Sequence, residues 1–308
     1  TQNCFDNHKI QHPITRGINK GNMKPSCCQS VFKCPKCKVM YDKEKFDMET
    51  HKCGDFWCGN CKSVANKGHK CYMMPCNLKA ENQNIIFFDF EATQNTKNKK
   101  HIVNYCIAQY LHDPTPIEFF NIDDFMNWLL DKKHETFIVI AHNGRGYDFQ
   151  LIQEWIYLNT SMKPSNVYAG SKIMILKLQE LQMRFVDSLN FLTMKLEKFP
   201  KTFGLTELKK GFFPHYHNTA ENFNYIGKIP DMKYFGYNGM NTQKREEFIK
   251  WWVAKRLTNY TWNQYEEMKA YCISDVDILR RSCIIFRQLY LDICDIDPFQ
   301  YTTIASVC

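Results

Sequence analysis

Residues 85–91 read Ile-Ile-Phe-Phe-Asp-Phe-Glu, and this stretch decides how the rest of the chain is interpreted. Its apolar run predicts a buried β-strand. Side chains alternate along a strand, so Asp89 and Glu91 are expected on the same side. Two carboxylates between apolar flanks are costly unless a cation neutralises them. The stretch therefore predicts a central strand that carries part of a divalent metal site.

Two further segments are expected to add acidic residues to this site. The apolar run 137–141 is followed by His-Asn-Gly-Arg-Gly-Tyr-Asp at 142–148. Glycines between a strand and a helix allow a close approach of the backbone, and place Asp148 on the first helical turn, facing the first strand. In the last long helical pattern Tyr271 and Asp275 are four residues apart and share a face, whereas Asp277 is turned roughly 200° away and is expected at the surface.

The four carboxylates of Asp89, Glu91, Asp148 and Asp275 suit two hard cations, Mg²⁺ or Mn²⁺. Two such ions about 3.5–4 Å apart generate a hydroxide and stabilise the leaving oxygen of a phosphodiester. The hydroxyl of Tyr271 is expected to orient the attacking water. This acidic set predicts an enzyme that cuts phosphodiester bonds.

The pattern of apolar segments indicates an α/β unit. We expect a mixed sheet of five or six strands flanked by helices, with strands near 85–90, 102–111, 137–141, 172–178 and 183–188, and helices near 122–132, 146–158, 242–257 and 262–291. Residues 211–241 are rich in Gly, Pro, Tyr and Asn without periodicity, and 211–260 are interpreted as an insertion.

Ten of the 15 cysteines lie between Cys4 and Cys76, interleaved with histidines, and this distribution favours metal binding over disulfides. A Cys-x-x-Cys pair followed by His-x-Cys occurs twice, as Cys34, Cys37, His51, Cys53 and as Cys58, Cys61, His69, Cys71. Three thiolates and one imidazole form a closed structural zinc set, so two Zn²⁺ are predicted. Sequential and cross-braced pairings both remain open, as does a third site using Cys27, Cys28 and Cys76.

The cysteine-rich segment is poor in long apolar runs, so zinc is expected to provide most of its folding energy. We divide the chain into a tail over 1–26, a zinc-binding module over 27–80 and a catalytic domain over 81–308. The module is also a candidate contact for a protein partner. The remaining cysteines lie in apolar segments and are interpreted as reduced core residues.

Composition limits the classes of function. The chain has 308 residues with a formal net charge of +8, and two zinc sites with three thiolates each lower this to about +6. A modest basic excess fits a polyanionic partner. No run of about 18 apolar residues and no secretory signal is evident, so no membrane contact is expected. We expect an intracellular protein. The nucleus is the preferred compartment, and the mitochondrion and the cytoplasm are alternatives.

Several motifs resemble the proofreading exonuclease domain of protein-primed family B DNA polymerases, which are DEDDy nucleases with an RNase H-like (DnaQ-like) fold. The similarity is strongest to polymerases of Maverick/Polinton-type mobile elements and their viral and organellar-plasmid relatives. It covers about residues 85–308. The motifs are FFDFEAT at 87–93, AHNGRGYDFQLI at 141–152, DSL at 187–189, LKKGFFPH at 208–215 and YCISDVDIL at 271–279.

The resemblance implies roles for individual residues. Asp89, Glu91, Asp148 and Asp275 match the metal carboxylates and Tyr271 the water-orienting residue. Lys209 matches a lysine near the scissile phosphate, where a cation stabilises developing charge. Positions that hold single-stranded DNA in the family are matched by Thr93, His142, Asn143, Ser188 and Leu189. Tyr147 is a further candidate, for stacking on a base.

The resemblance predicts a two-metal 3′→5′ exonuclease acting on single-stranded DNA. The polymerase palm motifs of the family do not occur in these 308 residues, and the segment ending at Cys308 resembles the junction into a polymerase region. We therefore expect either one domain of a polymerase or a domesticated, transposon-derived nuclease. An RNA 3′ exonuclease is one alternative, because the metal chemistry does not depend on the 2′-hydroxyl. A non-catalytic scaffold for nucleic acid or protein is another.

Overall fold

A computed structural model of the protein describes residues 12–13, 23–24, 27–71, 81–95, 100–205, 208 and 211–307. The chain divides into two compact units, Thr1–Asn77 and Leu78–Cys308, and each is described by itself. No helix within the described ranges is long and apolar enough to span a bilayer.

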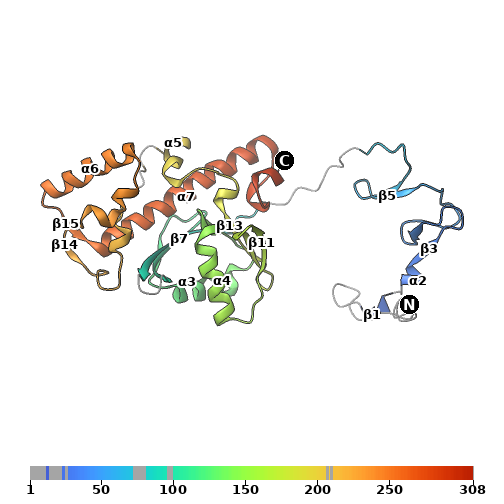
Figure 1. The fold of residues 1–308 in the computed structure, drawn as a ribbon, viewed down its shortest axis with the longest axis horizontal. Coiled ribbons are helices and arrows are strands. Elements are labelled where there is room, and N and C mark those ends of the chain that lie inside the picture. Colours follow the sequence, from blue (N-terminus) through green and yellow to red (C-terminus); the bar gives the residue numbers. More distant parts are fainter. Residues whose placement is uncertain are drawn as a thin grey trace. The chain divides into compact units, whose positions relative to one another are not determined.

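The smaller unit is built from short hairpins (Figure 1). Its apolar core contains Phe32, Tyr41 and Phe46 beside Cys34, which is far less than a unit of this length usually buries. The hairpins pair β3 with β4 and β5 with β6, and a further antiparallel pair joins β1 to β2. The bounds are β1 His12–Pro13, β2 Met23–Lys24, α2 Cys27–Ser30, β3 Val31–Lys33, β4 Met40–Asp42, β5 Phe56–Cys58 and β6 Ser63–Ala65.

The larger unit is organised around a seven-stranded sheet with the order β11-β12-β13-β10-β7-β8-β9. The three central strands, β13, β10 and β7, are parallel, and the outer pairings are antiparallel. The bounds are β7 Ile85–Asn95, β8 Lys100–Tyr110, β9 Ile117–Phe119, β10 Ile138–Ala141, β11 Ser165–Ala169, β12 Lys172–Leu178 and β13 Met183–Asp187.

Helices cover both faces of this sheet (Figure 1). Along β7, Ile85 and Phe87 pack into one apolar cluster with the long helix α7, while Phe88 and Phe90 pack into a second cluster with α3 and α4. The strand is apolar on both faces because it is buried on both. The helices are α3 Ile122–Leu129, α4 Asp148–Asn159, α5 Phe199–Thr202, α6 Thr242–Leu257 and α7 Gln264–Cys294.

The prediction of a mixed α/β sheet flanked by helices is confirmed, but five or six strands was too few. The two additional strands are both at sheet edges. Strand β9 has only three residues, and β11 is largely exposed, so neither has the apolar run that marked the central strands.

Residues 211–260 form an aromatic lobe around the first half of α7. Buried Phe235, Phe248 and Trp262 contact one another, with ring centroids 5.1 and 5.9 Å from that of Phe235. Strand β14, Ile226–Lys228, pairs with β15, Thr261–Asn263, directly before α7. The segment predicted as an irregular insertion therefore extends the apolar cluster between the sheet and α7, mainly with aromatic rings.

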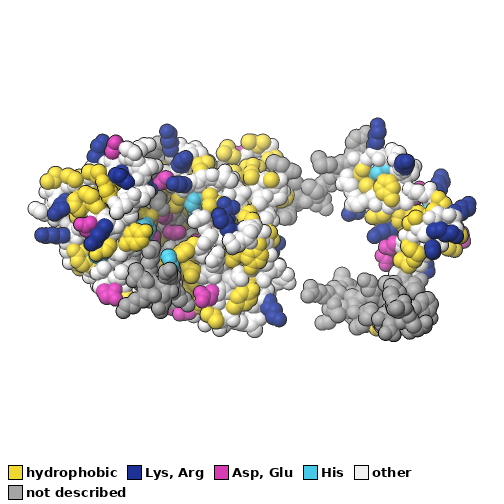
Figure 2. Space-filling view, in the orientation of Figure 1, with side chains coloured by type: hydrophobic (Ala, Val, Ile, Leu, Met, Phe, Trp, Pro, Cys, Tyr) yellow, Lys and Arg dark blue, Asp and Glu magenta, His cyan; other side chains and the backbone are white. Residues whose placement is uncertain are grey.

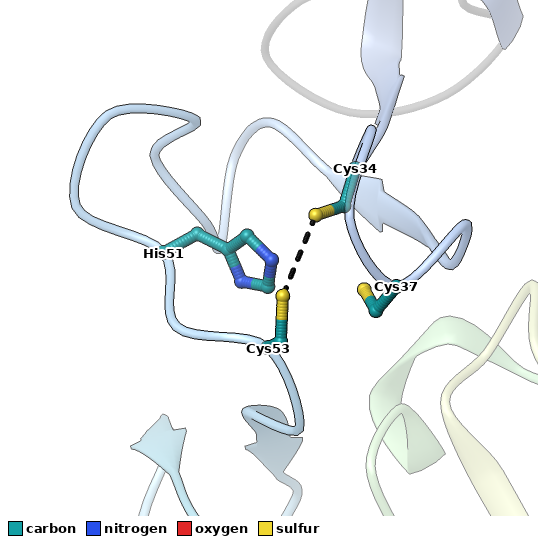
Figure 3. A group of neighbouring side chains, drawn as sticks. All are labelled: Cys34, Cys37, His51 and Cys53. Carbon is teal, nitrogen blue, oxygen red and sulfur yellow. Dashed lines mark hydrogen bonds between the residues drawn. The ribbon is translucent and has the colours of Figure 1, made fainter.

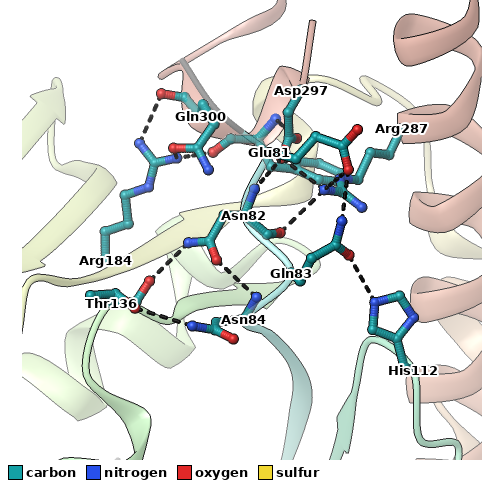
Figure 4. Close-up of polar contacts among 11 residues, drawn as sticks. Glu81, Asn82, Gln83, Asn84, His112, Thr136, Arg184, Arg287, Asp297 and Gln300 are labelled. Carbon is teal, nitrogen blue, oxygen red and sulfur yellow. Dashed lines mark hydrogen bonds and ion pairs between the residues drawn. The ribbon is translucent and has the colours of Figure 1, made fainter. Parts of the chain in front are cut away.

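A polar network joins the first residues of the larger unit to those after α7 (Figure 4). Asp297 is 1% exposed, and its carboxylate accepts hydrogen bonds from the backbone N–H of Asn82 at 3.1 Å and of Phe299 at 3.1 Å. Arg287 forms an ion pair with Asp297 at 3.0 Å and also donates to the carbonyl of Asn82. The network satisfies backbone groups that would otherwise be buried without partners.

Replacing Asp297 by alanine should lower the free energy of unfolding by about 3 kcal/mol, because buried Arg287 then keeps only the more exposed carboxylate of Glu81, 3.5 Å away, as a counter-charge. Urea unfolding followed by circular dichroism measures this. The control is Asp292→Ala on the exposed surface of α7, expected to change stability by less than about 0.5 kcal/mol. Equal effects of the two variants would contradict a structural role for the network.

Candidate functional site

Three central parallel strands bring the predicted acidic segments to the edge of the sheet that is formed by the carboxyl ends of these strands. Ile140 of β10 is paired with Phe87 of β7, so Asp89 and Glu91 lie beyond the point where β10 turns away. Ala141 is paired with Asp187 of β13, and the segment 142–148 therefore crosses the same edge. A β-bulge follows Glu91, and bulges commonly redirect side chains beside functional sites.

A cavity of about 770 Å³ opens at this edge. It is lined by Asp89 and Glu91 from β7, by Asp148 from α4, and by Tyr271 and Asp275 from α7. Figure 2 shows acidic side chains gathered in a recess of the larger unit, with histidines beside them. The four carboxylates and the tyrosine singled out in the sequence thus face one space.

The buried carboxylate of Asp187 fixes the loop that enters the cavity. It accepts hydrogen bonds from the backbone N–H groups of Asn143 at 3.0 Å, Arg145 at 2.9 Å and Leu189 at 2.8 Å. Asn143 itself adopts a left-handed conformation with φ of 65°. At Gly144 an added Cβ would lie 2.7 Å from the Phe149 ring, so only glycine fits there. The loop therefore has one conformation, and it delivers Asp148 to the cavity.

Asp148 has the character of a cation ligand. Burial, together with the charges of Asp187 and Glu91, raises the pKa of Asp148 to about 7. Its Oδ1 is buried and accepts no hydrogen bond from the described part of the chain. A carboxylate oxygen in this position is costly in the metal-free protein, and a divalent cation would satisfy it. The residues present therefore fit Mg²⁺ or Mn²⁺.

Tyr271 is held against the cavity wall by rings. Its ring stacks on Phe213 with centroids 5.3 Å apart, and the edge of His215 lies 5.5 Å away. Burial and the neighbouring carboxylates, Asp275 foremost, raise the pKa of Tyr271 well above its ordinary value. The hydroxyl therefore keeps its proton at neutral pH and can both donate and accept a hydrogen bond.

The residues proposed to hold DNA occupy different positions. Asn143, Leu189, His142 and Tyr147 line the cavity. Ser188 is fully buried and its hydroxyl lies 2.8 Å from Nδ1 of His142, so a hydrogen bond to Ser188 orients the imidazole of His142.

Thr93 is not among the described residues that line the cavity, and its hydroxyl donates to the carbonyl of Ile102 across the strand pair, at 3.4 Å. Lys209, Cys76 and the side chains of Cys27 and Cys28 lie outside the described residues.

Sequence reasoning missed several cavity residues. His215 Nδ1 lies 3.5 Å from Oε2 of Glu91, and His101 Nδ1 lies 2.9 Å from the hydroxyl of Tyr147. Lys244 and Glu197 also line the cavity and pair with each other at 2.7 Å. His215 and Glu197 lie in short turns, whereas His101 lies near the start of β8 and Lys244 on α6, and local pattern gives none of these positions a functional role. Asp187 could have been recognised as an acidic residue that directly follows Met-Arg-Phe-Val in a predicted strand.

Each predicted zinc set assembles in the smaller unit. The donor atoms of Cys34, Cys37, His51 and Cys53 lie within 4.8 Å of one another (Figure 3), and the second set, Cys58, Cys61, His69 and Cys71, does the same. The ligands are grouped sequentially and not cross-braced. Sγ of Cys34 lies 3.7 Å from Sγ of Cys53, close to the roughly 3.8 Å expected for two sulfurs on one tetrahedral zinc.

The chemistry of these donors fits zinc. The backbone N–H of Cys37 lowers the pKa of Cys34 to about 7, and backbone N–H groups of Cys61 and Asn60 lower the pKa of Cys58 to about 6. Both ring nitrogens of His51 are buried without a hydrogen-bond partner among the described residues. Thiolate formation and an unpaired buried imidazole are both satisfied by a bound cation. A zinc ion held by all four protein donors of a set would have no open position for a substrate, which is typical of a structural site.

Comparison with known proteins identifies the family. The family described as DNA polymerase type B, organellar and viral, matches residues 131–307, which is more than half of the chain. The chain belongs to this family. The match contains Asp148, Tyr271 and Asp275 of the cavity, and Asp187 beneath it.

Individual relatives agree with this placement. A probable DNA polymerase of Neurospora intermedia is 27% identical over 186 residues, covering 57% of this chain and 19% of the relative. One of Podospora anserina is 32% identical over 83 residues, covering 26% and 7%. The chain thus spans about a fifth or less of these relatives. Among solved structures, Phi29 DNA polymerase complexed with single-stranded DNA is similar with a TM-score of 0.44 and 16% identity, over 68% of this chain and 32% of that chain.

Metal analysis of the native protein should find about two zinc ions per chain. Cys58→Ser should lower this to about one, because it removes a ligand from one set only. The matched control is Cys294→Ser, which changes an exposed cysteine on α7 outside both sets and should leave the content unchanged. Absence of zinc from the native protein, or full retention in Cys58→Ser, would refute the assignment.

Binding of Mn²⁺ to the acidic cavity should weaken as the pH falls through about 7. The pKa of Asp148 is raised from 3.8 to about 7, so its ionisation destabilises the metal-free protein as the pH rises over this interval, and its proton competes with the cation at the lower end. The rise in melting temperature on adding Mn²⁺ should therefore be larger at pH 8 than at pH 6.

Asp148→Asn should remove this pH dependence, while Asp277→Asn should keep it. Asp277 lies outside the cavity lining and pairs with Arg280 at 3.2 Å. A shift in melting temperature that is equal at both pH values in the native protein would argue against Asp148 as a ligand.

Proposed function

We propose that the larger unit is a 3′→5′ exonuclease that hydrolyses phosphodiester bonds at the 3′ ends of single-stranded DNA. One observation carries this proposal: a single cavity collects Asp89, Glu91, Asp148, Asp275 and Tyr271 from three elements. Membership of a DNA polymerase family supports DNA as the substrate. We also propose an RNase H-like fold for the larger unit and a zinc-binding module over residues 27–80.

The four carboxylates would hold two Mg²⁺ or Mn²⁺ ions. When bound, these cations supply Lewis-acid activation of a water and neutralise charge on the phosphate. Asp148, with a pKa near 7 in the metal-free protein, would be ionised by the nearby cations. The loop held by Asp187 positions Asp148 before any metal arrives, which limits the reorganisation needed during catalysis.

The neutral hydroxyl of Tyr271 would position the attacking water. Its ring is clamped by Phe213, so the hydroxyl has little freedom to move. His142, held by Ser188, and Leu189 line the wall of the cavity where the terminal nucleotide would lie. These groups bind and orient the strand end, which is the main contribution that protein side chains make to phosphoryl transfer.

Purified protein with Mg²⁺ should shorten a 5′-labelled single strand progressively from its 3′ end. The double variant Asp89→Ala with Glu91→Ala should lose more than about 100-fold in rate, since weakening even the second shell of a metal site costs about 10–100-fold. Denaturing gel electrophoresis of the products measures both. Asp277→Ala is the control, a carboxylate removed from the same helix as Asp275 but outside the cavity lining.

The same assay on an RNA strand of equal sequence separates the two nuclease hypotheses. Faster loss of RNA than of DNA would reverse the substrate assignment. No cleavage of either strand with Mg²⁺ or Mn²⁺, or cleavage that survives the double variant, would overturn the proposed function.

A further inference from the structure

A second hollow adjoins the acidic cavity. It has a volume of about 720 Å³, and its lining includes Lys198, Lys201, Phe212, Asn241 and Gln243. Glu197 and Lys244 line both the hollow and the acidic cavity, so their side chains form the boundary between the two spaces.

An exposed ion pair forms part of this boundary. Nζ of Lys244 lies 2.7 Å from Oε2 of Glu197, and the two side chains are 42% and 34% exposed. Glu197 belongs to a short turn, Leu196–Lys198, and Lys244 to the first turn of α6. An ion pair this exposed contributes only about 0.2–1 kcal/mol, so another anion can displace Glu197 from Lys244 at little cost.

The two spaces differ in charge. Among the described residues, the acidic cavity is lined by four carboxylates besides Glu197 and by Lys195 and Lys244. The described lining of the hollow instead combines three lysines with two glutamates, Glu197 and Glu247, and adds the amides of Asn241 and Gln243. Phe212 and Leu208 provide apolar contacts. Cations for phosphates beside an apolar wall for bases are the features that bind single strands without sequence preference.

A strand whose 3′ end lies in the acidic cavity must leave through an opening that accepts its remaining phosphates. We propose that it leaves across the Glu197–Lys244 boundary into the hollow, and that Lys244 then exchanges Glu197 for a phosphate of the strand. The inference rests on the proposed function and extends it to the path of the substrate. Glu197 acts as an internal competitor, which occupies Lys244 when no strand is present and repels phosphates when one arrives.

This arrangement predicts opposite effects for the two halves of the pair. Lys244→Gln removes a phosphate contact and should weaken binding of an oligothymidylate of about twelve nucleotides about fivefold, with a salt slope lower by about one. Glu197→Gln removes the competitor and should tighten binding. A phosphorothioate strand in Ca²⁺ keeps the probe intact, and fluorescence anisotropy gives the dissociation constant.

Three controls complete the experiment. Lys250→Gln removes a charge from an exposed position of α6 outside both linings and should change binding less than Lys244→Gln. Lys244→Arg keeps the charge and should retain affinity. A thymidine dinucleotide is too short to reach the hollow and should bind equally to all variants. Urea unfolding of each variant verifies that the fold is intact.

Opposite shifts for Glu197→Gln and Lys244→Gln support the proposed path. Weaker binding in both would show that the pair only ties α6 to the rest of the unit, and would overturn the proposal, as would no change in either or no binding by the native protein. Cleavage of an unmodified strand in Mg²⁺ is scored separately. A protein that cleaves but shows parallel shifts refutes the path alone, whereas opposite shifts without cleavage refute the exonuclease alone.

Discussion

The carboxylate of Asp187 is the contact on which the site depends. Three backbone N–H groups, from Asn143, Arg145 and Leu189, converge on its two oxygens at the end of the central parallel strands. An isolated buried carboxylate would be unstable, and these donors together with the nearby guanidinium of Arg145 make it tolerable. In return the carboxylate fixes a loop of unusual backbone conformation. The position of Asp148 relative to the first strand follows from that loop.

The central part of the fold could be predicted from sequence because local pattern and burial agree there. Successive apolar residues of β7 pack into the two apolar clusters in turn, so both faces of this strand are buried. Helix α6 occupies the predicted range 242–257. The edge strands β9 and β11 could not be predicted. Their pairing depends on neighbours distant in sequence, through a register that in β11 is interrupted by a bulge. The aromatic lobe was hidden for a similar reason, since its rings contact one another across irregular segments.

The candidate site shows the same division. Asp89 and Glu91 were found because they interrupt an apolar strand, which is a local anomaly that chemistry must explain. His215 and Lys244 gave no such anomaly, because a histidine after a proline or a lysine on a charged helix is unremarkable until the fold brings it to the cavity. The zinc sets were recognisable because ligand spacing is itself local. Sequence therefore indicated the candidate ligands, and the structure added the residues that surround them.

The network of Asp297 and Arg287 has a consequence for how the larger unit can be handled as a module. It brings the chain entering at Asn82 against the chain leaving after α7, with Asn82 N and Asp297 Oδ2 only 3.1 Å apart. Two segments that lie this close favour circular permutation, in which a short linker joins them and new termini are opened in an exposed loop.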